Sequence, residues 1–280
     1  SLSSYARSAL STAQHLLVPR GLRLFGGGAQ AALAAYGVIQ GMSLPILLFP
    51  AALIAVIADL IVPELTEAQV QGRLRGLGYM LERLYRLGLF FSMAVAGACF
   101  FFAHPLGELI YSEPAAGQYI RLLAPLVPIM YMDTLVDGML KGVGEYRANM
   151  RYNIIDAATG LLLVWLLLPR YGVAGYLFSI SATELLNFAL SAARLTRVTV
   201  FRLQPLCWLL TAAAAVGGWW LLRLIFGRLL SRTGQPLILL LLVFLYLACY
   251  GAALLLCGAL RREELSWLFS LLQGEKSPKT

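Results

Sequence analysis

The 280-residue chain has few charged side chains and little that could perform chemistry. Charged residues make up 13% of it and hydrophobic residues 60%. A soluble domain carries about one quarter charged residues, so this composition excludes an ordinary soluble protein. The two histidines, His15 and His104, are isolated, and no HExxH, GxSxG, Walker A or DDxxD pattern occurs. An enzyme is therefore not expected.

Cysteine is also scarce. The four cysteines lie inside apolar segments, without a CxxC or Cys/His cluster. We interpret them as packing residues and expect no metal or cofactor. A basic-then-apolar signal segment is missing too, and residue 1 is serine rather than methionine. The opening residues read as the second half of a helix, so we expect the sequence to be a fragment.

What the chain does contain is a succession of apolar segments that approach membrane length. Crossing a bilayer core takes about 20 residues of α-helix. Seven segments are candidates, and a polar-flecked helix at the N-terminus is an eighth. The sequence therefore predicts an all-α polytopic membrane protein. The seven segments lie at about 36–62, 87–103, 118–140, 154–169, 173–193, 205–226 and 236–260.

The net charge of +8 comes from bases in the gaps between these segments. They form no aromatic-interleaved patch, so nucleic acid is not expected, and anionic membrane lipids are the predicted partners. If successive connections lie on opposite sides of the membrane, one side holds the gaps near 63–86, 141–153 and 194–204 and the C-terminal tail. That side carries 14 of the 22 bases. The positive-inside rule then predicts a cytoplasmic C-terminus, and we expect the membrane to be the plasma membrane.

Residues 63–86 carry a narrow apolar stripe. Val70, Leu74, Leu77, Leu81 and Leu84 recur at spacings of four and three. This predicts an amphipathic helix at about 66–84 in the cytoplasmic interface. The alternative is a helical extension of the next span.

Two spans contain paired prolines, which remove backbone hydrogen bonds and predict kinks. Pro45 and Pro50 lie in the 36–62 segment, and Pro125 and Pro128 lie in the 118–140 segment.

The N-terminal helix places Ser4, Arg7 and Ser11 on one face. An arginine inside a span is costly unless it meets water, a partner or an anion. A guanidinium can bind phosphate or pyrophosphate with two parallel hydrogen bonds, so we place these residues in a substrate cavity. Alternatively, Arg7 pairs with an acid on another helix or reaches the interface.

Asp133, Asp137 and Lys141 follow one another at intervals of four residues. Asp137 and Lys141 stand in the favourable order for a helical ion pair, which predicts a structural lock near the cytoplasmic mouth. Asp133 has no local partner, and the alternative role for it is gating or coupling to a proton or sodium ion.

A polar stripe in the 173–193 segment includes Glu184 and Asn187. We assign these two to the substrate cavity, with interhelical hydrogen bonding as the alternative. For Asn149 and Asn153, before and at the start of the 154–169 segment, hydrogen bonding between helices is the favoured interpretation.

Several long strings resemble the second half of flippases in the multidrug/oligosaccharidyl-lipid/polysaccharide exporter superfamily. They most resemble the branch of stage V sporulation protein B and related polysaccharide biosynthesis proteins. The resemblance extends over about residues 1–200, whereas the remainder matches only in hydropathy. The strings are Ser1–Leu22, Ala32–Ile54, Leu60–Ala68, Ala124–Glu145 and Leu167–Tyr176.

The resemblance implies a fourteen-helix, MATE-like fold made of two lobes around a cavity. This chain would supply helices 7–14. Residues 1–200 would form a six-helix lobe with a truncated first helix, residues 201–262 two additional helices, and residues 263–280 a cytoplasmic tail. The missing N-terminal lobe would complete the cavity.

The resemblance also implies a function, which is alternating-access transport of an undecaprenyl-type lipid-linked oligosaccharide or peptidoglycan precursor. Arg7 is the position that could carry over a pyrophosphate-binding role. The alternatives are a cation-coupled multidrug exporter of the same superfamily and a non-transporting scaffold for cell-wall synthesis. A membrane glycosyltransferase or acyltransferase is a further one.

Overall fold

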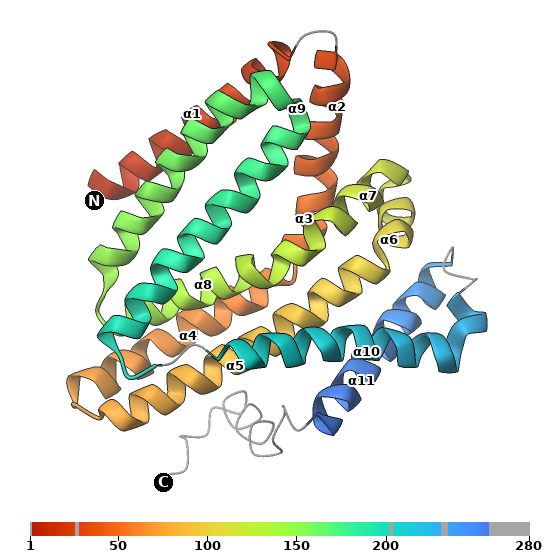
Figure 1. Ribbon diagram of the computed structural model, residues 1–280. Coiled ribbons are helices and arrows are strands. Elements are labelled where there is room, and N and C mark those ends of the chain that lie inside the picture. Colours follow the sequence, from red (N-terminus) through yellow and green to blue (C-terminus); the bar gives the residue numbers. More distant parts are fainter. Residues whose placement is uncertain (1, 26–27, 202–203, 231–234, 258–280) are drawn as a thin grey trace.

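The computed structural model describes residues 2–25, 28–201, 204–230 and 235–257, excluding the side chains of 2–7, 11, 15, 74 and 228–230. Every regular element in these ranges is a helix, which confirms the predicted all-α architecture (Figure 1). The predicted C-terminal tail lies outside the described residues. Among the described residues, six helical stretches are long and apolar enough to cross a membrane: Ala29–Leu48, Arg75–Phe101, Pro114–Gly142, Tyr146–Val198, Pro205–Gly227 and Pro236–Leu256.

The longest of these helices, α9 (Tyr146–Val198), consists of two arms that meet at Gly172. Its φ of 54° and ψ of −129° lie in a region that is essentially restricted to glycine. The arms contain the segments predicted as separate spans at 154–169 and 173–193. Helix α1 (Leu2–Arg23) lies beside the first arm (Figure 1). Gly21 permits this approach, because a Cβ there would lie 3.0 Å from the Cβ of Leu168.

The outward face of the first arm matches the thickness of a bilayer. Ile155, Leu162 and Trp165 on this face are 45–63% exposed. Exposed arginines, Arg151 and Arg170, lie on either side of this apolar stretch. The helix rises about 28 Å between them, and a hydrocarbon core is about 30 Å thick. The face therefore suits contact with lipid tails, with a charged residue at each interface.

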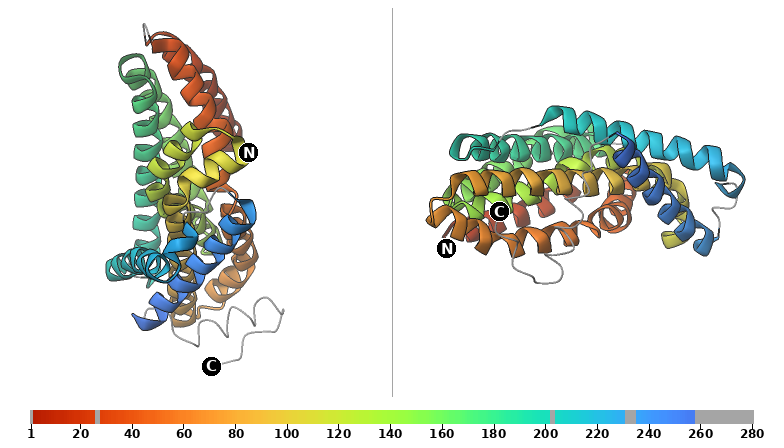
Figure 2. Two further views of the ribbon diagram at one scale, coloured as in Figure 1. Left: turned by 90° about the vertical axis from the view of Figure 1, so that its right-hand side faces the viewer. Right: turned by 90° about the horizontal axis from the view of Figure 1, so that it is seen from below.

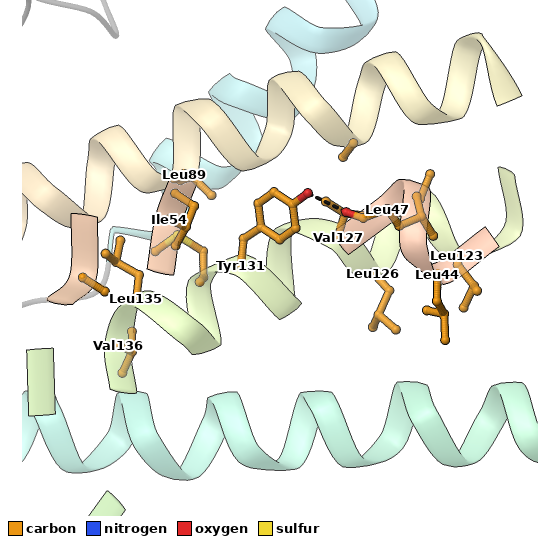
Figure 3. Packing of buried hydrophobic residues seen from close by; sticks show 14 of the residues in the cluster. Leu44, Leu47, Ile54, Leu89, Leu123, Leu126, Val127, Tyr131, Leu135 and Val136 are labelled. Carbon is orange, nitrogen blue, oxygen red and sulfur yellow. Dashed lines mark hydrogen bonds between the residues drawn. The ribbon is translucent and has the colours of Figure 1, made fainter. Parts of the chain in front are cut away.

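The apolar segment at 36–62 is not one continuous span. It includes the end of α2 (Ala29–Val38), a π-helical turn η2 (Ile39–Ser43), α3 (Leu44–Leu48) and the first part of α4 (Ala51–Val70). The helix breaks at Phe49–Pro50, because Pro50 has no N–H to continue the hydrogen-bonding pattern. The hydroxyl of Tyr131 donates to the carbonyl of Leu47 beside this break (Figure 3). The predicted kink is thus a break with a specific partner.

The prediction of a separate interfacial helix at 66–84 is wrong. The stripe is divided between α4 and α5 (Leu74–Phe101) by a turn at 71–73, where Gly72 has a φ of +67°. Leu77, Leu81 and Leu84 are at most 3% exposed, so this part of the stripe packs inside the protein. The alternative, a helical extension of the next span, describes α5.

Helices α6 (Ala103–Tyr111) and α7 (Pro114–Leu123) form a short pair that leads into α8. A 3-10 turn, η3 (Ala124–Leu126), joins α7 to α8 (Val127–Gly142) where Pro125 and Pro128 predict a kink. Helix α8 packs closely on α4 through two glycines. A Cβ on Gly138 would lie 2.7 Å from that of Ala58, and one on Gly142 would lie 2.8 Å from that of Leu65.

The last two helices, α10 (Pro205–Leu230) and α11 (Pro236–Leu256), cross one another and pack on α5 (Figure 2). Two tyrosine hydroxyls and one indole hold them there. Tyr250 donates to the carbonyl of Phe90 at 3.0 Å, and Trp208 Nε1 donates to the hydroxyl of Tyr85 at 3.0 Å. The hydroxyl of Tyr246 in α11 donates to the carbonyl of Ala215 in α10 and so joins these two helices to each other. This part of the chain is therefore attached through α5.

Candidate polar site between α8 and α9

Six polar residues meet where α8 packs between the two arms of α9. Each helix segment contributes a pair four residues apart, which is one helical turn. We call these six residues the polar seam. Its members are Asp133 and Asp137 on α8, Asn149 and Asn153 on the first arm, and Asn187 and Ser191 on the second.

Hydrogen bonds across the polar seam tie α8 to both arms. Asn187 Nδ2 donates to Asp133 Oδ2 at 2.8 Å. Asp137 receives Ser191 Oγ on one carboxylate oxygen and Asn153 Nδ2 on the other, each at 3.1 Å. The amide Nδ2 of Asn153 also lies 3.0 Å from Asn149 Oδ1. Because the donors come from different segments, the seam cross-links three parts of the bundle.

An ion pair closes one end of the polar seam. Arg194, near the end of α9, binds Glu145 in the α8–α9 turn through Nε and Nη2, at 2.9–3.1 Å. The two side chains are 36% and 25% exposed, so the pair lies at the edge of the protein interior. The planar guanidinium holds the carboxylate in a fixed orientation. The turn between α8 and α9 is thereby fastened to the second arm.

The predicted lock between Asp137 and Lys141 is wrong. Lys141 is exposed, and within the described ranges the two side chains form no ion pair. Asp137 faces the interior, where amide and hydroxyl donors satisfy both of its oxygens. Lys141 lies one turn nearer the end of α8, where its ammonium group stays hydrated. Hydration there is more favourable than burial beside Asp137.

Further carboxylates lie near the end of the polar seam that is formed by Asp133 and Asn187, away from the Glu145–Arg194 pair. Glu184 lies three residues before Asn187 and is half-buried. The charges of Asp137, Glu184 and Asp156 are close enough to interact with Asp133. Asp133 Oδ1 and Asn187 Oδ1 are buried and accept no hydrogen bond from the residues that the structure describes. No three His, Cys, Asp or Glu residues in those ranges are grouped as metal ligands.

The three residues predicted on the first helix are only partly described. Ser4, Arg7 and Ser11 belong to α1, which packs against the first arm of α9. Their side chains lie outside the described residues. Nearby, a Cβ on Gly160 would lie 3.3 Å from Gln14 and 3.4 Å from Thr183. Gln14 of α1 and Thr183 of the second arm therefore both approach Gly160 on the first arm.

The sequence matches a known family over about half of its length. The MatE family model matches residues 23–166. These residues are just over half of the chain and extend from the end of α1 into the first arm of α9. The chain belongs to the MatE family.

A curated relative supports this MatE assignment. The chain is 26% identical over 185 residues to Stage V sporulation protein B of Bacillus subtilis (strain 168). The alignment covers 65% of this chain and 36% of the relative, so the chain spans about a third of the relative's length. The MatE match includes Asp133, Asp137, Asn149 and Asn153 but not the second arm.

Sequence reasoning missed two contacts of this MatE protein. Glu145 and Arg194 are 49 residues apart, and no local spacing pairs them. Tyr131 and Leu47 are 84 residues apart, and nothing in the sequence pairs them. The asparagines Asn149 and Asn153 form interhelical bonds, as the favoured interpretation predicted.

Proposed function

We propose that this MatE chain is part of a flippase that moves an undecaprenyl-type lipid-linked oligosaccharide or peptidoglycan precursor across the plasma membrane. No covalent bond is made or broken in this role. The observation that carries the proposal is the MatE match over half the chain. The multi-pass helical architecture and the likeness to Stage V sporulation protein B support it.

The physical task is to move a polar, anionic head through hydrocarbon while its polyprenyl tail stays in lipid. A transporter needs a stable body and an element that can bend. The polar seam provides the first, because it joins α8 to both arms of α9. The break at Phe49–Pro50 provides a place where the second can change direction. Both features suit alternating access.

In this proposal the chain supplies helices 7–14, and an N-terminal lobe of the same protein completes the cavity. The C-terminus is cytoplasmic. Arg7, with Ser4 and Ser11 on the same face, binds the pyrophosphate of the lipid carrier. A guanidinium suits this group because its fork of donors matches phosphate oxygens.

The test uses the full-length protein in vesicles loaded with a fluorescent polyprenyl-diphosphate saccharide. We expect Arg7→Ala to abolish movement between leaflets and Arg7→Lys to retain part of it. Arg20→Ala, at the exposed end of the same helix, is the matched control and should behave as wild type. Wild-type movement by Arg7→Ala would remove the assignment of Arg7. No movement by the wild-type protein would contradict the proposed function and favour a scaffold.

A cation-coupled exporter of the same superfamily is the second candidate, favoured by the carboxylates around Asp133. Half-buried carboxylates that lie close together repel one another when ionised, and a bound cation or proton would relieve that repulsion. Under this hypothesis Asp133→Asn uncouples transport from a sodium or proton gradient. If transport by Asp133→Asn keeps the gradient dependence of wild type, Asp133 has only its structural role.

A further inference from the structure

The π-helical turn η2 exposes a polar face that the polar seam does not include. We call it the Gln40 face and define it by Tyr36, Gly37, Gln40, Gly41 and Tyr176. The rings of Tyr36 and Tyr176 meet edge to face, with centroids 5.0 Å apart. The hydroxyl of Tyr176 donates to Gln40 Oε1 at 2.9 Å. Tyr176 lies in the second arm of α9, so this bond fixes the orientation of the exposed Gln40 amide.

The two glycines leave the backbone of this face bare. A Cβ built on Gly37 or on Gly41 would meet no atom within 4 Å. They are one turn apart and both exposed, on either side of Gln40. Neither glycine is needed for packing within the described chain. Glycine at such positions permits close approach of a ligand to the backbone.

The face also presents hydrogen-bonding groups that are not used within the described chain. In η2 the Leu44 N–H bonds to the carbonyl of Ile39 rather than to that of Gln40. The next residue, Pro45, has no N–H, so the Gln40 carbonyl loses its helical donor. No described residue accepts a hydrogen bond from Gln40 Nε2. Gln40 therefore carries an amide donor and a carbonyl acceptor that no described residue pairs.

These groups lie near the middle of a membrane-length helix. Gln40 is about 16 Å along the helix from Ala29 and about 12 Å from Leu48, both ends of a candidate span. Unsatisfied amide and carbonyl groups at this depth cannot face lipid tails without a large penalty. Their partner must itself donate and accept hydrogen bonds.

We propose that the Gln40 face binds the sugar of the transported lipid, a site that rests on the proposed function. A sugar ring offers hydroxyl groups to the amide and carbonyl of Gln40. Its C–H face packs against the half-buried ring of Tyr36, while Tyr176, 5% exposed, supports that ring from behind. The bare glycines give it room to approach. A π-helical turn within a helix is itself frequent at functional sites.

A second helix packed on Gly37 and Gly41 is the competing occupant, because small residues four apart are typical of helix contacts in membranes. The observations favour a sugar. The apolar face of a helix would leave the Gln40 amide and carbonyl without partners. Hydroxyl groups satisfy both.

The experiment compares full-length wild type, Gly41→Leu and Gln40→Leu in nanodiscs. Binding is measured for a polyprenyl diphosphate that carries a disaccharide and for the same lipid without sugar. Gly251→Leu is the matched control, because a Cβ at Gly251 in α11 also meets no atom. We expect both face variants to bind the disaccharide lipid at least tenfold more weakly and the sugar-free lipid as wild type does.

Each other outcome overturns the proposal for a distinct reason. Equal loss for both lipids would move the effect to the pyrophosphate. Wild-type binding by both face variants would remove the sugar site but leave the proposed function intact. A lower melting temperature of ligand-free Gly41→Leu, with unchanged lipid binding, would identify a helix contact. If wild type binds neither lipid, the proposed function fails as well.

Discussion

The hydroxyl of Tyr131 offers the sharpest test of how the broken span is held. Tyr131 is fully buried, and its hydroxyl donates to the Leu47 carbonyl beside the Phe49–Pro50 break (Figure 3). Tyr131→Phe removes one oxygen atom and keeps the ring, including its stacking on Phe91 at 6.2 Å between centroids. The variant therefore isolates a single hydrogen bond.

The magnitude follows from burial on both sides of that bond. An interhelical hydrogen bond in a membrane protein contributes about 0.6 kcal/mol on average and up to about 1.7 kcal/mol. Leu47 is also fully buried, so its carbonyl would lose this donor without gaining water. We therefore expect Tyr131→Phe to lower the free energy of unfolding by about 1–2 kcal/mol. That corresponds to roughly a 5- to 30-fold change in the folded/unfolded ratio.

The assay is reversible unfolding of the full-length protein by sodium dodecyl sulfate in mixed micelles. Tyr119→Phe on α7 is the control, because the Tyr119 hydroxyl has no hydrogen-bond partner among the described residues. It should change stability by a few tenths of a kcal/mol at most. If Tyr131→Phe is as stable as Tyr119→Phe, the hydroxyl does not stabilise the break, and the reasoning is refuted.

Three further variants test the packing of the bundle. Gly138→Leu should prevent stable folding, because its Cβ alone would come within 2.7 Å of Ala58, and detergent extraction should recover mainly aggregate. Gly172→Ala should cost about 1–3 kcal/mol in the unfolding assay, since φ is 54° and ψ is −129°. Arg194→Gln should cost about 1 kcal/mol, because its pair with Glu145 is partly exposed, and the loss should shrink as salt is raised.

Substitutions of Gly251 serve as controls for the two glycine variants. Gly251→Leu and Gly251→Ala should leave stability near wild type, since a Cβ there meets no atom. A folded Gly138→Leu protein would show that α4 and α8 are not in close contact. An unchanged Gly172→Ala would argue against the glycine-only conformation at the junction of the arms. For the ion pair, a second substitution, Glu145→Gln, should cost little more once Arg194 is changed.

Several elements of the fold followed from the sequence because they depend on local physics. Apolar length predicted the spans, since a bilayer accepts only helices or closed barrels. Paired prolines predicted interruptions near Pro45 and Pro128. The form of each interruption was not predictable. At Pro50 the helix breaks, and the hydroxyl of Tyr131 forms a hydrogen bond beside the break. At Pro125 the helix instead forms a 3-10 turn.

Side-chain partners were harder to predict because helical periodicity fixes a face but not what lies opposite. Spacing placed Asp137 one turn from Lys141, and the predicted ion pair does not form. The leucine stripe of 66–84 predicts a helix in the cytoplasmic interface, yet Leu81 is fully buried inside the protein. In both cases tertiary packing decided between water, lipid and protein as the neighbour.

The sequence by itself determined that this protein is a helical membrane protein of the MatE type, with interrupted spans and polar residues at depth. Hydrophobic length and proline chemistry act within a single helix, so they can be read from the chain. Only the tertiary structure decided that Asp133 meets Asn187, 54 residues away, and that Gln40 meets Tyr176, 136 residues away. Such pairs depend on how helices cross, and no local pattern encodes the crossing.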